Sequence, residues 1–339
     1  MNRFSWWIWN ALVFCHCLMF SATHVAAEQP RQLQIVLTGS GELELAPHGV
    51  GNIYAPEVIY QDGLYQMWYG AQGADGHDRI LYAESKDGLQ WDRRGVAIDN
   101  GDSNHVNDPT VVVVKGKYYM HYTRAVRDVI DQIDVAVSED GKTWEHKGVA
   151  LKASDEGAWD SLSVGRPTVL YERGLFHLWY DGRKDFSENA PVSGVPKSKN
   201  SRRSVGYAIS QDGLEWTRFP FNPVFENNAG GIDVARIDDS LIMLYESGRG
   251  TCLAESASGT VWEDRGLFIP KTGQEDDAFG HVTPHLVAGS GTQLNLYVGA
   301  APHRSWNRNR IGLILLDQEV LKPFLKGVTE DADPEFPAE

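Results

Sequence analysis

Acidic and histidine side chains stand where several apolar segments of the sequence begin or end. Asp108 opens the run Asp-Pro-Thr-Val-Val-Val, and Asp233 opens Asp-Val-Ala-Arg-Ile. Carboxyl and imidazole groups transfer protons in catalysis when their surroundings tune the pKa. The alternative for each of them is a structural role, capping a strand or pairing with an arginine. The predicted catalytic residues are Asp108, Glu57, Asp233, Asp181, Glu246 and His285.

Arginine and aromatic residues near the same segment ends could bind a ligand. A guanidinium group suits carboxylates and sulfates because it contacts two oxygens at once. Aromatic rings can stack on a sugar ring, or they can simply cover the core. For the arginines, the alternative is ion pairing with the acids of neighbouring sheets. The predicted binding residues are Tyr54, Trp159, Asp160, Arg166, Arg183, Arg249, His281, Arg304 and Trp306.

A repeated hairpin motif predicts the elements that would position these side chains. Ser85-Lys-Asp-Gly-Leu-Gln-Trp91 recurs at 138–144 and 210–216, and in weakened form at 256–262. Asp-Gly between two alternating apolar runs is typical of a tight β-hairpin. A second pair of extended segments precedes each hairpin, so each repeat reads as four antiparallel strands, as in a propeller blade. His121 and His177 lie inside such segments and are predicted to be packed.

Five copies of the inner strand pair can be counted, which predicts an all-β fold, a five-bladed β-propeller. The fifth copy lacks one strand, and the segment Leu33 to Leu37 can supply it, so that strands from both ends of the chain close the ring. The loops before each first strand and after each second strand would then open on one face around the axis. We predict a single domain over 28–316, an acidic surface tail over 317–339, and a long loop over 184–204 that forms a wall or lid of this face.

The first 27 residues have the pattern of a signal peptide. Arg3 precedes the apolar run from Trp6 to Phe20, and Val25-Ala-Ala27 provides a cleavage site after Ala27. The predicted location is secreted or periplasmic, and an uncleaved membrane anchor is the alternative. Beyond this segment only Cys252 remains, too few cysteines for an internal disulfide or a metal cage. The net charge of −15 disfavours nucleic acid and anionic membranes as partners. The oligomeric state stays open.

The hairpin motif, with proline at the start of the inner strand, resembles that of the five-bladed glycosidase superfamily. This superfamily includes glycoside hydrolase family 43, invertases, mannoside phosphorylases and agar-oligosaccharide hydrolases. The resemblance implies a carboxylate pair that acts on a glycosidic bond, with a third acid that separates their pKa values. Asp108 matches the Asp-Pro pattern, and Glu57 resembles the acid after Trp-Ala-Pro in arabinanases. Ala55 and Arg166 stand where the pattern implies further acids.

We therefore predict a secreted carbohydrate-active protein, a glycoside hydrolase that acts on a poly- or oligosaccharide. The arginines favour an anionic glycan with uronic acid or sulfate groups. His285 could replace the missing general acid, as histidine does in some agar-acting relatives. The alternative is a non-catalytic carbohydrate-binding propeller for polysaccharide capture, export or modification, and a sialidase is a weaker third option. No cofactor and no metal ligands are predicted, and a central divalent cation is left open.

Overall fold

The computed structural model describes residues 32–127, 130–289 and 292–325. The predicted signal peptide, residues 1–27, lies outside the described residues, as do residues 326–339 of the predicted tail. Nearly all regular secondary structure in the described chain is β-strand, and its long strands form antiparallel sets of four that follow the predicted repeats. The all-β prediction and the four strands in each repeat are confirmed.

The first three sets are separate sheets, each in sequence order from its inner to its outer strand. The first contains β2 (Ile53–Gln61), β3 (Leu64–Gln72), β4 (Asp78–Ser85) and β5 (Asp92–Ile98). The second contains β6 (Val106–Val114), β7 (Lys117–Arg127), β8 (Ile130–Ser138) and β9 (Glu145–Leu151). The third contains β10 (Ser163–Glu172), β11 (Leu175–Arg183), β14 (Ser204–Ser210) and β15 (Thr217–Arg218).

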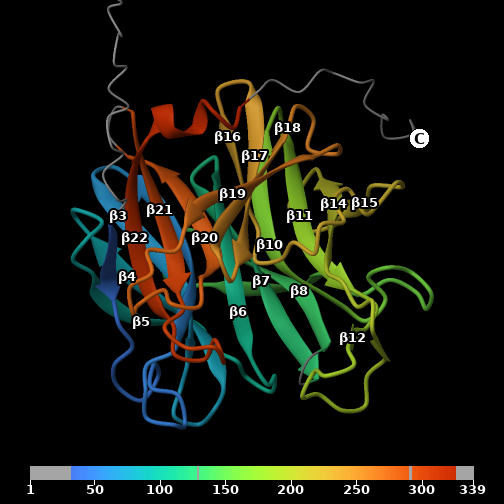
Figure 1. The fold of residues 1–339 in the computed structure, drawn as a ribbon, viewed down its shortest axis with the longest axis horizontal. Helices are drawn as coiled ribbons and strands as arrows, with labels where there is room; N and C mark the ends of the chain where they lie inside the picture. The colour runs from blue at the N-terminus through green and yellow to red at the C-terminus, as the bar shows by residue number, and fades with distance from the viewer. Residues whose placement is uncertain (1–31, 128–129, 290–291, 326–339) are drawn as a thin grey trace, which may run out of the picture. The chain divides into compact units, whose positions relative to one another are not determined.

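The fourth and fifth sets join into one eight-stranded sheet through the pairing of Ser247 with His281. The fourth contains β16 (Asp233–Ile237), β17 (Ser240–Ser247), β18 (Gly250–Ser256) and β19 (Glu263–Pro270). The fifth contains β20 (His281–Ala288), β21 (Gln293–Ala300), β22 (Arg310–Asp317) and β1 (Leu33–Leu37). As predicted, β1 pairs antiparallel with β22, so the two ends of the described chain share a sheet (Figure 1).

The Ser-x-Asp-Gly sequence forms each hairpin because its side chains bind the turn's own backbone. Ser85 Oγ accepts hydrogen bonds from the N–H groups of Asp87 and Gly88, at 3.2 and 2.9 Å. The Asp87 carboxylate accepts two more, from Leu89 and Gln90 at 2.8 Å each. Gly88 has a φ of 74°, which favours glycine. The second and third repeats reproduce these contacts.

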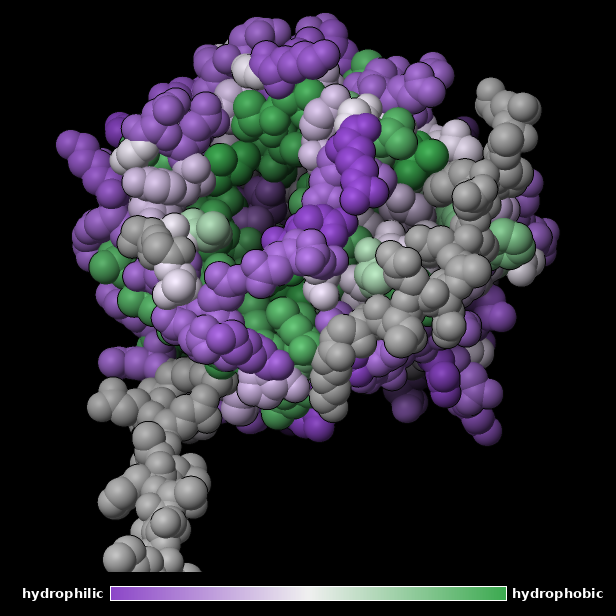
Figure 2. All heavy atoms as spheres, turned by 90° about the horizontal axis from the view of Figure 1, so that it is seen from above, coloured by the Kyte–Doolittle hydropathy of each residue, from purple (hydrophilic) through white to green (hydrophobic). Residues whose placement is uncertain are grey.

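The carbonyl of the hairpin glycine also connects one repeat to its neighbour. A buried side chain from the second strand of the preceding repeat contacts that carbonyl in three cases, and in a fourth the contact runs from the fifth set of strands to the first. The pairs are Trp68 Nε1 with Gly141 (2.9 Å), His121 Nε2 with Gly213 (2.8 Å), Trp179 Nε1 with Gly259 (2.7 Å) and the Tyr297 hydroxyl with Gly88 (3.0 Å). His121 is fully buried, so its predicted packed position is confirmed. On the face seen from above, apolar residues show in recesses between the polar periphery and a band of polar residues that crosses the middle of the face (Figure 2).

Two segments outside the sets of four strands contain secondary structure that the sequence does not predict. The long loop over 184–204 contains two short parallel strands, β12 (Phe186–Ser187) and β13 (Lys197–Ser198). The expected surface tail begins as a 3-10 helix, η1 (Gln318–Leu321), and Leu321 is fully buried in an apolar cluster with β16–β22 residues. Nowhere in the described chain is there a helix long and apolar enough to cross a membrane.

Candidate functional site

A repeated backbone irregularity turns one side chain of each inner strand toward a common pocket. Four residues that directly precede a proline have left-handed backbone conformations: Ala55 (φ 50°), Asp108 (48°), Arg166 (46°) and Thr283 (42°). The pairing with the next strand shifts register at each of these positions. Such a bulge re-aims a side chain and costs about 1–3 kcal/mol per strained residue, so it is typical of functional sites. Gly231 (φ 54°) takes the corresponding place before β16.

These five residues line a narrow pocket. A second group lines the same pocket, and each of its members lies two positions after one of the five: Glu57, Thr168, Asp233 and His285. The second group and Thr110 contact the backbone of the next inner strand. The contacts are Glu57 with Val111 N (2.8 Å), Thr110 with Val169 N (3.2 Å), Thr168 with Val234 N (3.1 Å), Asp233 with Leu286 N (2.8 Å) and His285 Nε2 with Val58 O (3.0 Å). Three of the predicted catalytic residues are therefore bound into a layer that joins the inner strands.

His285 lies between two of those acids. Its Nδ1 is 3.2 Å from Glu57 Oε2 and 3.3 Å from Asp233 Oδ1. Burial alone would lower the pKa of His285, but the two carboxylates outweigh burial and raise it to about 10. Burial raises the pKa of Glu57 to about 7, although the positive charge of His285 acts to lower it. The three groups form a buried ionic cluster, which we call the Glu57–His285–Asp233 cluster.

A wider cavity of about 350 Å³ adjoins this narrow pocket, and the two share Asp108, Arg166 and Thr283. Its walls combine carboxylates, cations, amides and aromatic rings, a composition suited to a polar ligand with apolar faces. The lining residues are Asn52, Tyr54, His105, Asn107, Asp108, Asp131, Ser163, Arg166, Arg183, Phe186, Glu246, Val282, Thr283, Trp306 and Asn309.

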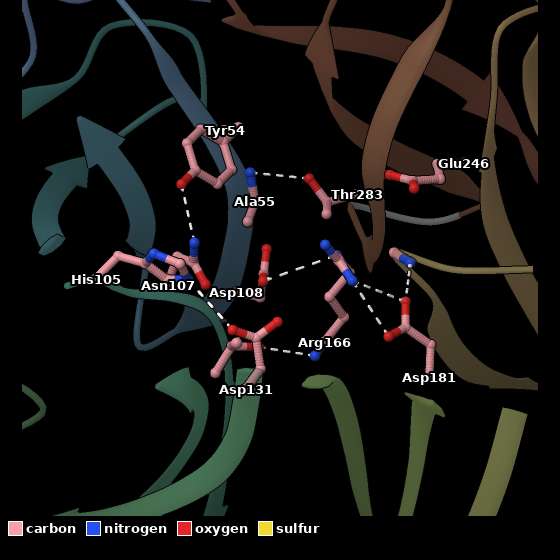
Figure 3. Close-up of polar contacts among 12 residues, drawn as sticks. Tyr54, Ala55, His105, Asn107, Asp108, Asp131, Arg166, Asp181, Glu246 and Thr283 are labelled. Atoms are coloured by element: carbon pink, nitrogen blue, oxygen red, sulfur yellow. Dashed lines mark hydrogen bonds and ion pairs between the residues drawn. The ribbon is translucent and has the colours of Figure 1, made fainter. Parts of the chain in front are cut away.

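Asp108 is the predicted catalytic residue that lines both spaces, and it is buried. Burial raises the pKa of Asp108 to about 6, and the negative charges of Asp181 and Asp131 add to this effect. The Arg166 guanidinium opposes it, with Nε 3.9 Å from Asp108 Oδ2 (Figure 3). A carboxyl group with this pKa keeps its proton in mildly acidic solution and can donate it to a ligand.

Asp131 also lines the cavity, although it was not among the predicted site residues. Its carboxylate is 3.3 Å from His105 Nε2, and it accepts a hydrogen bond from the Ser163 hydroxyl at 3.3 Å. Burial by itself lowers the pKa of His105, but Asp131 outweighs burial and raises it. The available signal was an acid near the start of the alternating run Ile-Asp-Gln-Ile-Asp-Val-Ala. Asn107 and Asn309 likewise line the cavity and were not predicted.

The two remaining predicted catalytic acids are bound by arginines. Both Asp181 oxygens lie 3.2 Å from Arg166 Nη1, and Asp181 also accepts from Arg203 and from the Gly231 N–H. These contacts engage both of its oxygens, and Asp181 does not line the cavity. Glu246 does line it and pairs with Arg203.

The predicted binding residues divide into two groups. Tyr54, Arg166, Arg183 and Trp306 line the cavity. Trp159, Asp160, Arg249, His281 and Arg304 do not. Trp159 stacks on Tyr180 at 5.8 Å, Asp160 accepts a hydrogen bond from the Tyr180 hydroxyl, and His281 is buried 3.3 Å from Asp277. These three side chains are engaged in the contacts just described, and they serve packing and loop anchoring rather than the cavity wall. In the described residues, no group of three or more His, Cys, Asp and Glu side chains could hold a metal ion.

Comparison with known proteins places this site in context. The family model for the glycosyl hydrolases family 32 N-terminal domain matches residues 100–254. An uncharacterized protein of Mycobacterium tuberculosis is 34% identical over 142 residues, which are 38% of this chain and 45% of that protein. A 1,2-beta-oligomannan phosphorylase of Thermoanaerobacter sp. is 29% identical over 130 residues, 37% of this chain and 41% of the enzyme. The chain thus spans less than half the length of these curated relatives.

The fold is similar to that of solved glycoside hydrolases. One such structure superposes with a TM-score of 0.66 and 18% identity, covering 83% of this chain and 90% of that one. The predicted resemblance to the propeller glycoside hydrolase superfamily is confirmed, with no single family within it specified.

Proposed function

We propose that the protein is a carbohydrate-active enzyme that cleaves a glycosidic bond in the cavity beside Asp108. The observation that carries this proposal is a buried carboxyl group, with its pKa raised to about 6, on the wall of an open cavity that a second acid, Asp131, also lines. Two carboxyl groups across a sugar bond are the chemical requirement for glycoside cleavage. The similarity to glycoside hydrolases in fold and in the matched family model agrees with this proposal.

The proposed roles follow from the contacts of each acid. Asp108 gives its proton to the leaving oxygen as the carbon–oxygen bond breaks. Asp131, held by His105 and Ser163, takes a proton from the water whose oxygen forms the new bond to the sugar. The negative charge of Asp131 adds to burial in raising the pKa of Asp108, which favours the protonated form of Asp108. Tyr54 and Trp306 offer aromatic surface to the sugar rings.

Two features of the whole chain belong to the same proposal. The five sets of strands would form a closed five-bladed propeller, which the contacts from each inner strand to the next, including His285 to Val58, support. The signal-type segment over 1–27 supports export to the periplasm or the medium.

An anionic glycan is the proposed substrate class, and Arg183 is the reason. The Arg183 guanidinium lies over the Phe186 ring, 4.5 Å from its centroid, at the cavity wall. Nearby acids already have partners, since Asp181 binds Arg166 and Arg203 while Asp131 binds His105. Burial and the charge of Arg166 lower the pKa of Arg183 to about 10, which leaves it protonated at neutral pH. A cation in this position is stabilised by a carboxylate or sulfate of the ligand.

The test is cleavage of a glycan panel by the wild type and the Asp108→Asn variant. The panel contains plant, algal and bacterial polysaccharides, digalacturonate and β-1,2-mannobiose, each with and without inorganic phosphate because one relative is a phosphorylase. We expect new reducing ends or sugar phosphates from the wild type and a loss of at least about 100-fold in the variant. Asp134→Asn is the matched control, since Asp134 is also buried and arginine-bound but lies outside the cavity.

Equal cleavage by the wild type and Asp108→Asn would remove Asp108 from the mechanism. Binding of a panel glycan without cleavage would favour the second candidate function, a carbohydrate-binding propeller. Ala55 and Arg166 favour that alternative, because they occupy the pre-proline positions where related sites carry acids.

A further inference from the structure

We infer that His105 is a positioning residue for Asp131, which it keeps ionised so that this carboxylate can take a proton from water. The inference rests on the proposed function and deepens it, because it explains how two acids in one cavity hold different protonation states. In the proposed reaction Asp108 must carry a proton before the sugar bond breaks, whereas Asp131 must be without one.

The two oxygens of the Asp131 carboxylate have different surroundings. Oδ1 is buried, has no hydrogen-bond partner among the described residues, and lies 3.3 Å from His105 Nε2. Oδ2 accepts a hydrogen bond from the Ser163 hydroxyl at 3.3 Å. Because Asp131 lines the cavity and its Oδ1 is buried, Oδ2 is the oxygen that can take a proton from a water molecule there. His105 therefore compensates the charge on one oxygen and leaves the other to the reaction.

The second set of strands fixes the position of His105 relative to Asp131. His105 directly precedes β6, and its carbonyl accepts a hydrogen bond from the Ala125 N–H on β7 at 3.0 Å. It also forms a parallel bridge with Asp78, the first residue of β4. Asp131 is the second residue of β8, and it pairs with Ala125 from the other side of β7. The two side chains thus approach each other from the two neighbours of one strand, held by its backbone.

Carboxylates from three strands act on His105 and favour its charged form. Burial acts to lower the pKa of His105, but Asp131, Asp78 and Asp108 together raise it, and Asp131 contributes most among the three. A positive imidazolium beside a carboxylate stabilises the negative charge of that carboxylate. The ion pair therefore stabilises His105 with a proton and Asp131 without one.

The other cations near Asp131 are engaged elsewhere. Arg166 and Arg183 both interact with the charge of Asp131. Arg166 is bound to Asp181 at 3.2 Å, however, and Arg183 lies over the ring of Phe186. His105 is thus the cation that pairs with Asp131 directly.

Unequal distances to the cations separate the two acids of the cavity. Two carboxyl groups in one cavity each disfavour the ionised form of the other. His105 Nε2 is 3.3 Å from Asp131, whereas the nearest approach of Arg166 to Asp108 is 3.9 Å. Burial raises the pKa of Asp108 to about 6 in spite of Arg166. The arrangement therefore favours the proton on Asp108 and the negative charge on Asp131, as the proposed reaction requires (Figure 3).

The first experiment follows kcat/KM against pH, with the panel glycan that the wild type cleaves, in the wild type and in His105→Gln. Turnover should fall at low pH where Asp131 takes up a proton, which forms the acid limb of the profile. Removing the charge of His105 should move this limb to higher pH by about one pH unit or more, the effect of an opposite charge close to a carboxyl group. His105→Lys keeps a positive charge and should leave the acid limb near its wild-type position.

The second experiment needs no substrate. The pKa of His105 is measured by NMR titration of its imidazole signals, which are assigned by their absence from His105→Gln. Because Asp131 contributes more than Asp108 to the raised pKa of His105, Asp131→Asn should lower this pKa more than Asp108→Asn does. The interaction between two sites is reciprocal, so the decrease in Asp131→Asn should match the displacement of the acid limb in His105→Gln.

His77→Gln is the matched control. His77 Nδ1 contacts the Asn104 carbonyl at 2.7 Å, so it anchors the segment that carries His105, but it lies outside the cavity. A purely structural effect on this segment would change stability and leave the acid limb in place. We therefore expect His77→Gln to lower the melting temperature without moving the acid limb.

The outcomes separate this inference from the proposed function. An acid limb that stays in place in His105→Gln, or that moves as far in His77→Gln, would overturn the inference and leave the proposed function intact. Equal pKa values of His105 in the wild type and in Asp131→Asn would do the same. Absence of cleavage of every panel glycan by the wild type would overturn the proposed function and this inference with it.

Discussion

Replacing His285 by glutamine would leave two buried carboxylates without a cation. Its Nδ1 is 3.2 Å from Glu57 and 3.3 Å from Asp233. At an effective dielectric constant of about 20, each contact has a Coulomb energy of about 5 kcal/mol, most of which the desolvation of the charges offsets. Removing one partner of a buried ion pair costs about 3–5 kcal/mol, because the remaining charge has no compensation. We expect His285→Gln to lower the free energy of unfolding by this amount at pH 8, which lies above the pKa of about 7 of Glu57 and below the pKa of about 10 of His285, so that the three groups are charged in the wild type.

The double variant Glu57→Gln/His285→Gln tests whether uncompensated charge is the cause. It removes one of the two stranded carboxylates, while the glutamine carbonyl can still accept the Val111 N–H that Glu57 binds. The double variant should therefore be more stable than His285→Gln alone. Urea unfolding followed by tryptophan fluorescence measures all the required free energies.

The difference in stability between the wild type and the double variant should also change with pH in a definite direction. The folded-state pKa of His285 is raised to about 10, above its ordinary value of 6.5. Its contribution to stability is therefore complete below about pH 6.5 and is lost as the pH rises through 10. The raised pKa of Glu57 acts in the same direction, with its contribution lost between its ordinary 4.5 and about 7. The wild type should thus lose stability relative to the double variant between pH 6 and pH 10.

Three results would refute this reasoning about the Glu57–His285–Asp233 cluster. The first is a cost below about 1 kcal/mol for His285→Gln, which is the range of an exposed ion pair. The second is a further loss of stability when Glu57→Gln is added to His285→Gln. The third is a parallel change of stability with pH in the wild type and the double variant.

Three further predictions concern the site and the sheets. Proton donation by Asp108, whose folded pKa is about 6, requires its protonated form, so turnover of any cleaved glycan should decline as the pH rises through 6; a flat profile from pH 5 to 8 would exclude this role. Trp179→Phe removes the 2.7 Å donor of the Gly259 carbonyl, which keeps its second donor, Trp262 Nε1 at 2.9 Å, and we expect about 0.5–1.5 kcal/mol of lost stability in urea unfolding, with no loss if the bond is dispensable. Gly206→Ala would place a Cβ 2.4 Å from the Tyr180 ring, and calorimetry should show a lower melting temperature, by an amount that corresponds to about 1–3 kcal/mol of overpacking.

The local structure could be predicted from the sequence because it depends on residues close together in the chain. The Ser-x-Asp-Gly turn is stabilised by its own serine and aspartate, so its three copies, with a weakened fourth that has Ser258 in place of the aspartate, locate the hairpins of the first four sets of strands. The alternating apolar runs likewise indicate which strands are buried. Asp108 was found because its neighbour is proline and because the pair occurs at the start of an inner strand.

The division of the acids between two layers required the tertiary structure. Asp108 and Glu57 resemble each other in sequence context, yet Glu57 lies one residue after its proline and Asp108 one residue before. The residue before proline has a left-handed backbone conformation at the bulge, which turns its side chain toward the cavity. The residue after proline binds the next inner strand. The sequence does not show where the strand pairing shifts. It therefore cannot tell which of two positions, two residues apart, faces the cavity and which binds the next inner strand.

The sequence by itself determined the strands, the turns and the kind of chemistry, since each depends on contacts within a single repeat. The tertiary structure alone decided which polar groups face the cavity and which are already bound. Asp131 and Asn309 join Asp108 there from distant segments, whereas Asp160 and His281 are engaged elsewhere. The physical reason is that the free capacity of a polar atom depends on its partners, and here those partners come from other sheets.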